Sequence, residues 1–178
     1  MQSDHTHHRP KSLLDLNYLY QEIDQITQSL AQMHDKRLHC RSGCVACCVD
    51  NLTVFEIEAL HIRQNHPDLL KNNRPHPLGA CAFLDEQNHC RIYADRPYVC
   101  RTQGLPLRWV EELEDGRVAE MRDICPVNES GTPVEELDRA ACWTIGPFEE
   151  KLANLQLHID KGKLNRIALR DLFMIQKP

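Results

Sequence analysis

Apolar residues recur every three or four positions in the N-terminal region, a spacing that predicts an amphipathic helix. The series is Leu16, Leu19, Ile23, Ile26, Leu30 and Met33. Ser12 and Asp15 precede it with the Ser-x-x-Asp spacing of a capping box, so the helix is expected to begin there. We expect its apolar face to pack on the domain's own core. A dimerising coiled coil is the alternative, because the same spacing forms a heptad seam.

A second capping-box pattern, at Thr53 and Glu56, predicts another helix. This helix is expected to end before Pro67, because proline disfavours helical geometry in the residue that precedes it. Residues 71–79 are rich in proline and asparagine, which is typical of a loop.

Two short hairpins are expected in the middle of the chain. Residues 80–93 show two short apolar runs around a polar turn, with Phe83 and Tyr93 expected in the core. The second hairpin spans residues 106–121 and turns at Asp115-Gly116, a dipeptide that favours a tight turn.

The C-terminal third shows helical spacing again. Phe148, Leu152 and Leu155 are expected on one helix face, and Gly162 is expected to end that helix. A last helix is predicted to carry Leu164, Ile167, Leu172 and Ile175.

These elements predict an α+β fold, mainly α: a small single domain of helices and short β-hairpins around a cysteine-rich metal-binding core. The expected organisation is a polar tail at 1–11 and one domain at 12–178, with a helical extension at 132–176. No internal repeat divides the chain.

Charge and hydropathy exclude several classes of function. A formal net charge of −5 disfavours nucleic-acid binding, which requires a basic face. No apolar run reaches the roughly 18 residues that a membrane span needs. The N-terminal segment lacks the apolar region of a secretory signal, so we expect a cytoplasmic protein.

The chemistry of this chain is concentrated in its nine cysteines. Cys40, Cys44, Cys47 and Cys48 lie within the stretch CRSGCVACCVD, called here the nest. A disulfide framework is disfavoured because the number of cysteines is odd and a chain of this length can fold without covalent cross-links. The C-x3-C-x2-C spacing also occurs in radical S-adenosylmethionine enzymes, but no repeated βα units are present to build their barrel. A thioredoxin-like dithiol is disfavoured because no βαβ pattern surrounds the C-x-x-C.

Thiolates are soft ligands that select zinc or iron–sulfur clusters, and the nest could supply several of them from one loop. Gly43 would allow the loop to turn tightly. Arg41, Arg91 and Arg101 each follow a cysteine directly; they either offset thiolate charge or form surface ion pairs. Cys47 and Cys48 are adjacent, so their side chains are expected to point in different directions.

The segments CRSGCVACC, LTVFEIEAL, CAFLDEQNHCRIYADRPYVCR and ICP together resemble the CxxCxxCC cysteine-cluster family of zinc- or iron-chelating domains. The resemblance covers about residues 38–126, although the first gap here is three residues instead of two. It implies a set of metal-associated cysteines: Cys40, Cys44, Cys47, Cys48, Cys81, Cys90, Cys100 and Cys125. The ninth, Cys142, lies outside the pattern, in a segment that is expected to be helical, and is expected to be a buried structural thiol.

Other residues of the motif are expected to be structural. Arg96-Pro97 is expected to form a turn that presents Cys100, and Asp95 to bind Arg96 or Arg101. No catalytic residues are predicted, and no protein partner is indicated.

The leading hypothesis is a cytoplasmic protein whose partner is a metal ion or cluster: an iron–sulfur cluster, such as 4Fe-4S, or zinc. An enzyme that uses the cluster beside an active site, for electron or methyl transfer, is one alternative. A metal-free thiol redox sensor is the other.

Overall fold

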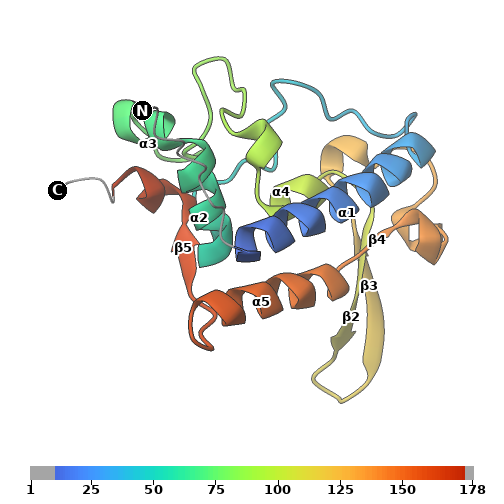
Figure 1. Ribbon diagram of the computed structural model, residues 1–178. Helices are drawn as coiled ribbons and strands as arrows, with labels where there is room; N and C mark the ends of the chain where they lie inside the picture. The colour runs from blue at the N-terminus through green and yellow to red at the C-terminus, as the bar shows by residue number, and fades with distance from the viewer. Residues whose placement is uncertain (1–10, 175–178) are drawn as a thin grey trace, which may run out of the picture.

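Figure 1 shows the computed structural model, which describes residues 11–174 as helices with two small sheets. The helices are α1 (Lys11–Met33), α2 (Glu56–Asn65), α3 (Pro67–Asn72), α4 (Tyr98–Thr102) and α5 (Pro147–Ile159). The strands are β1 (Thr53–Phe55), β2 (Leu107–Glu112), β3 (Val118–Asp123), β4 (Trp143–Thr144) and β5 (Arg166–Ala168). Short 3-10 helices occupy Tyr93–Asp95, Pro126–Asn128, Val134–Glu136, Arg139–Ala141 and Leu169–Phe173. The α+β class, mainly α, is therefore confirmed.

Helix α1 packs its apolar face on the domain's own core, beside α5 (Figure 1). The buried members of the expected series are Leu16, Leu19, Ile23 and Leu30. Ile26 and Met33 are instead 38% and 59% exposed, so the face is narrower than the spacing implied. The chain is already helical at Lys11, which places Ser12 inside the helix and makes the predicted cap there wrong.

Helix α2 begins later than its predicted cap, because Thr53 belongs to strand β1. Phe55 is the N-cap, and its backbone N–H donates to the Glu58 carboxylate at 3.2 Å. Pairing with β5 holds residues 53–55 extended and so displaces the helix start. The predicted end is confirmed: α2 stops at Asn65, and Pro67 begins α3.

Strands β1 and β5 pair antiparallel, with Val54 opposite Ile167. The prediction of a last helix is therefore wrong, because residues 166–168 form a strand and a 3-10 helix follows. Val54 and Leu169 are buried in a common apolar cluster. This burial stabilises the extended pairing and outweighs the local helical spacing. Ile175 lies outside the described residues.

The second sheet has the strand order β3-β2-β4. Strands β2 and β3 form the predicted hairpin, and Gly116 supplies the positive φ of 78° that its turn requires. Strand β4 joins β2 in parallel and contains the segment after Cys142, which was expected to be helical. Trp143 lies opposite Leu107 there and is buried, which ties the hairpin to the main core.

The expected hairpin at 80–93 is reduced to a single bridge between Leu84 and Cys90. The Asp85 carboxylate accepts the backbone N–H groups of Gln87 and His89, at 2.9 and 2.8 Å, and so closes a compact turn in place of strands. Phe83 is fully buried as predicted. Tyr93 is 65% exposed, so its assignment to the core is wrong.

Two apolar clusters stabilise the fold. The first lies between α1, α4, α5 and β4, and Trp143 is its largest fully buried residue. The second surrounds Phe83 and Ile62 and includes Cys81, while Cys48 and Cys90 pack against it. The cysteine-rich segments therefore rest on a core of their own.

Glu58 connects the two halves of the fold through buried hydrogen bonds. Its carboxylate accepts from the Tyr20 hydroxyl and from the backbone N–H of Tyr98, both at 2.9 Å, and from Phe55 as described above. Burial raises the pKa of this carboxyl, while the hydrogen bonds oppose the shift.

Glu58→Ala is expected to lower the free energy of unfolding by about 3 kcal/mol or more, because it leaves several buried donors without an acceptor. Denaturant titration by circular dichroism measures the change. Gln64→Ala is the control, since Gln64 lies exposed on the same helix and should change stability by less than about 0.5 kcal/mol. Equal losses in the two variants would contradict the role of Glu58.

Candidate metal centre

The nest forms a loop of consecutive tight turns between α1 and β1. Backbone N–H groups of Cys44 and Cys48 donate to Arg41 and Val45, both at 2.9 Å. Gly43 adopts a φ of +85°, as expected for a loop that reverses within a few residues. The turns hold several thiols close together on one short segment.

A backbone hydrogen bond joins the nest to the next cysteine segment: the Cys81 N–H donates to the Cys48 carbonyl at 2.9 Å. The Leu84–Cys90 bridge then returns the chain, which places Cys90 beside Cys81. Segments more than thirty positions apart in the sequence therefore meet here, which local spacing alone could not determine.

Cys100 lies on the short helix α4, directly after the Arg96-Pro97 turn, as predicted. Burial, followed by the neighbouring thiolates of Cys81, Cys90 and Cys47, raises the pKa of Cys100 to about 12. The pKa of Cys48 is raised first by its neighbour Cys47 and by burial, and the thiolates of Cys81 and Cys100 add to the shift. One group, called here the inner group, thus contains Cys47, Cys48, Cys81, Cys90 and Cys100.

Cys40 belongs to a second group. Burial raises the pKa of its thiol, as do the thiolates of Cys44, Cys125 and Cys47. The outer group is therefore Cys40, Cys44 and Cys125, and Cys47 lies within electrostatic reach of both groups.

Asn128 anchors the outer group. Its side-chain amide donates to the Cys40 sulfur at 3.2 Å and to the Gly104 carbonyl at 2.8 Å, and its oxygen accepts from the His39 N–H at 2.8 Å. A Cβ atom on Gly104 would lie 2.6 Å from the Cys40 sulfur, and the φ of +90° at this position also favours glycine. Amide N–H donors to sulfur are a typical second layer around thiolate ligands.

The expectation that Cys47 and Cys48 point in different directions is wrong. Their thiols interact directly: a hydrogen bond from Cys48 lowers the pKa of Cys47 to about 6, and the same bond raises the pKa of Cys48. The Cys48 backbone N–H donates to the Val45 carbonyl at 2.9 Å and the Val49 N–H to the Cys47 carbonyl at 3.1 Å, so both cysteines lie in tight turns. The pair therefore offers two sulfurs to one location.

The arginines that follow cysteines have different roles. Arg91 donates to the Ala82 carbonyl at 2.7 Å; burial raises the pKa of the Cys81 and Cys90 thiols, and the Arg91 charge opposes that shift, which fits the predicted charge compensation. Arg101 is buried, pairs with Asp24 at 2.5 Å and lies over the Tyr20 ring. Arg41 is exposed.

The Asp95 carboxylate was expected to bind Arg96 or Arg101, and these expected partners are wrong. Its oxygens contact the imidazoles of His61 and His66 at 3.0 and 2.8 Å. His61 lies on α2 and His66 directly follows that helix, and α2 contacts the 3-10 helix that carries Asp95, so Asp95 is structural but has other partners.

Cys142 is buried, with 5% of its surface exposed, as predicted. It lies between a 3-10 helix and β4, and the Arg122 guanidinium is its polar neighbour at 3.8 Å. This position is on the hairpin side of the molecule, outside both cysteine groups.

The donors present fit a thiolate-bound metal in chemical type. All nine cysteines are free thiols, and the inner group rests on an apolar cluster that would shield a metal from water. Within residues 11–174, no three or more His, Cys, Asp or Glu side chains already stand in ion-holding positions.

The fold and the cysteine groups define a small cysteine-rich α+β protein. Residues 39–126 match the family model CxxCxxCC, described as "Putative zinc- or iron-chelating domain". The chain therefore carries, over about half of its length, a domain of this family. Comparisons with curated proteins and with solved structures found no match.

Sequence reasoning missed Asn128 and Gly104, which contact Cys40 from distant parts of the chain. Asn128 follows Cys125 by three residues, and its backbone N–H donates to the Cys125 carbonyl at 2.7 Å. A polar residue in a turn after a cysteine is the sequence signal that marks such a position, but nothing local identifies its distant partner.

Within residues 11–174, no helix is both long and apolar enough to span a membrane.

Proposed function

We propose that this protein binds zinc or iron through thiolates, with the inner group as its principal site. The observation that carries the proposal is the convergence of Cys47 and Cys48 with Cys81, Cys90 and Cys100, which come from separate segments of the chain. A metal shared by these sulfurs would stabilise the fold, because it would cross-link a loop, a turn and a helix.

The outer group, Cys40, Cys44 and Cys125, supplies the remaining donors that the family implies. It contains three cysteines, and a fully protein-bound tetrahedral site needs four ligands. Cys47 is also in electrostatic reach of Cys40 and would bring the outer group to four sulfurs, which makes it the donor where the two groups join.

Within this proposal, an iron–sulfur cluster is favoured over zinc. Zinc ribbons commonly pair two short knuckles, whereas here one tight nest is combined with widely spaced cysteines. A cubane cluster bound by four cysteines accommodates such spacing, since its sulfur ligands approach from several directions.

Anaerobic purification of the full chain tests the metal type. We expect brown protein that contains stoichiometric iron and sulfide. Its spectrum should show an absorption band at the blue end of the visible range. Colourless protein with stoichiometric zinc would retain thiolate metal binding but contradict the cluster. Protein that is fully reduced and lacks both metals would contradict the proposal and favour the thiol redox sensor.

The setting that we propose is a reducing compartment such as the cytoplasm. The support for it is chemical: all nine cysteines are free, and exposed thiols such as Cys40 and Cys47 persist only where oxidation is prevented. We also propose that residues 12–178 fold as one domain, since α1 and α5 lie outside the family match and still share a core with Tyr98.

A further inference from the structure

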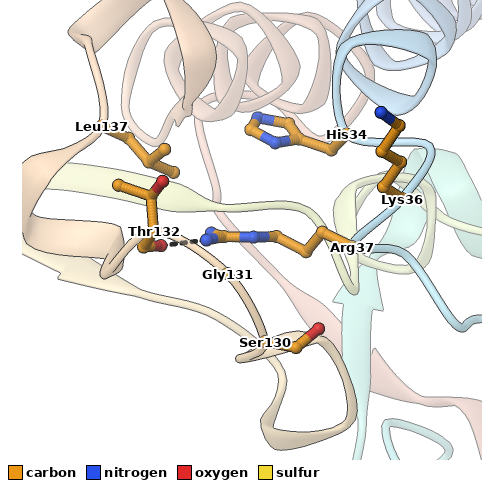
Figure 2. Close-up of a pocket in the computed structure, with 7 residues that line it drawn as sticks. All are labelled: His34, Lys36, Arg37, Ser130, Gly131, Thr132 and Leu137. Atoms are coloured by element: carbon orange, nitrogen blue, oxygen red, sulfur yellow. Dashed lines mark hydrogen bonds between the residues drawn. The ribbon is translucent and has the colours of Figure 1, made fainter.

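A pocket of about 290 Å³ lies outside the family-matched region, between the end of α1 and the loop that follows Cys125 (Figure 2). His34, Lys36 and Arg37 form one side of it, and residues 130–132 with Leu137 form the other. None of the residues that line it is acidic. The pocket is therefore small, positively charged and separate from the cysteine groups.

Arg37 is the central feature of the pocket. The residue is only 7% exposed, and Figure 2 shows its side chain extending across the pocket toward Thr132. Its Nη2 donates to the Thr132 carbonyl, whereas the buried Nη1 has no hydrogen-bond partner among the described residues. A buried guanidinium with an unused donor is costly, which indicates that an acceptor from outside the chain belongs there.

His34 and Lys36 strengthen this interpretation. The His34 Nε2 donates to the Ala141 carbonyl at 2.7 Å, which fixes the ring orientation beside Arg37 (Figure 2). Lys36 is exposed and adds a second permanent positive charge to the lining. Two cationic side chains without a lining carboxylate attract an anion and disfavour a cation.

The opposite wall is held in place before any ligand arrives. Arg122 donates to the carbonyls of Val134, at 3.0 Å, and of Leu137. Gly131 lies so near the Arg37 guanidinium that an added Cβ would be 3.4 Å from Nη2. Its φ of +98° also favours glycine, so the loop lies close against the Arg37 guanidinium.

We propose that this pocket binds a small oxyanion group, the carboxylate or phosphate of a small molecule. The Nη1 of Arg37 donates to the oxyanion, and the charge of Lys36 adds attraction. Guanidinium groups match planar carboxylates and phosphates in geometry, and hydrogen bonds to charged acceptors are the stronger kind. The site is independent of the metal, because its lining residues lie outside residues 39–126.

Calorimetric titration of the purified full-length protein tests the proposal. Sodium phosphate and sodium acetate are titrated separately, with sodium chloride at matched ionic strength as the reference. We expect phosphate or acetate to bind where chloride does not, and the tighter of the two identifies the oxyanion class. Arg37→Gln is expected to weaken this binding about tenfold or more, because a charge-assisted hydrogen bond is lost.

Arg117→Gln is the matched control, since Arg117 is an exposed arginine in the β2–β3 turn, paired with Asp115. It should leave oxyanion binding unchanged. If Arg37→Gln does not fold, Lys36→Gln decides the matter, because Lys36 is exposed; binding about threefold weaker is expected. The proposal is overturned if neither anion binds in preference to chloride. It is overturned equally if binding persists unchanged in Arg37→Gln or, where that variant does not fold, in Lys36→Gln.

Discussion

Removal of the metal is expected to lower the melting temperature by about 10 °C or more, because metal binding in a thiolate site contributes directly to folding free energy. A loss of even about 4 kcal/mol has this effect in a domain of this size, at about 2–4 °C per kcal/mol. The inner group joins the nest, the turn at 81–90 and helix α4, so its release would leave these segments without a common anchor. Thermal unfolding of anaerobic protein, before and after verified chelation, measures the shift.

The control for this experiment is chelator that has been saturated with metal beforehand, which should leave the melt unchanged. Readdition of the metal under reducing conditions should restore the original melting temperature. An unchanged melt after verified metal removal would show that the site does not stabilise the fold.

The second large effect is expected from Cys100→Ala, which should lose most of the bound metal or yield insoluble protein. Cys100 lies among Cys81, Cys90 and Cys47, and its removal takes the only α4 sulfur from the inner group. Breaking a four-thiolate site leaves an open coordination position that water or oxidant can attack. Metal-to-protein stoichiometry, measured on protein prepared without oxygen, reports the outcome.

Cys142→Ala is the matched control for this variant. Cys142 is also buried but lies beside Arg122, outside both cysteine groups, so the variant should keep its full metal content. We expect it to cost about 1 kcal/mol of stability, as for a small buried side chain. Retention of metal by Cys100→Ala together with loss by Cys142→Ala would show that the ligands are assigned wrongly.

Much of the helical structure was predictable because its pattern is local. The three- and four-residue spacing from Leu16 to Leu30 identified α1, and Pro67 marked the boundary after α2. Asp115-Gly116 identified the hairpin of β2 and β3. Each of these signals lies within a few residues of the structure that it predicts.

Predictions failed where a distant partner outweighed the local pattern. Ile167 has helical spacing with its neighbours, but pairing with Val54 makes it part of a strand. Thr53 resembles a helix cap, but the same pairing draws it into β1. Strand pairing across more than a hundred residues cannot be inferred from the spacing of either segment alone.

The sequence by itself determined the donor chemistry of this protein: nine thiols, the tight nest and the family to which residues 39–126 belong. Only the tertiary structure decided how these thiols divide into an inner and an outer group, and that Asn128 and Gly104 enclose Cys40. It also decided that Arg37 lies buried beside the loop at residues 130–132, with one guanidinium donor unused. The physical reason is that residue type and short spacing fix which atoms are available, whereas distances between remote atoms depend on the path of the whole chain.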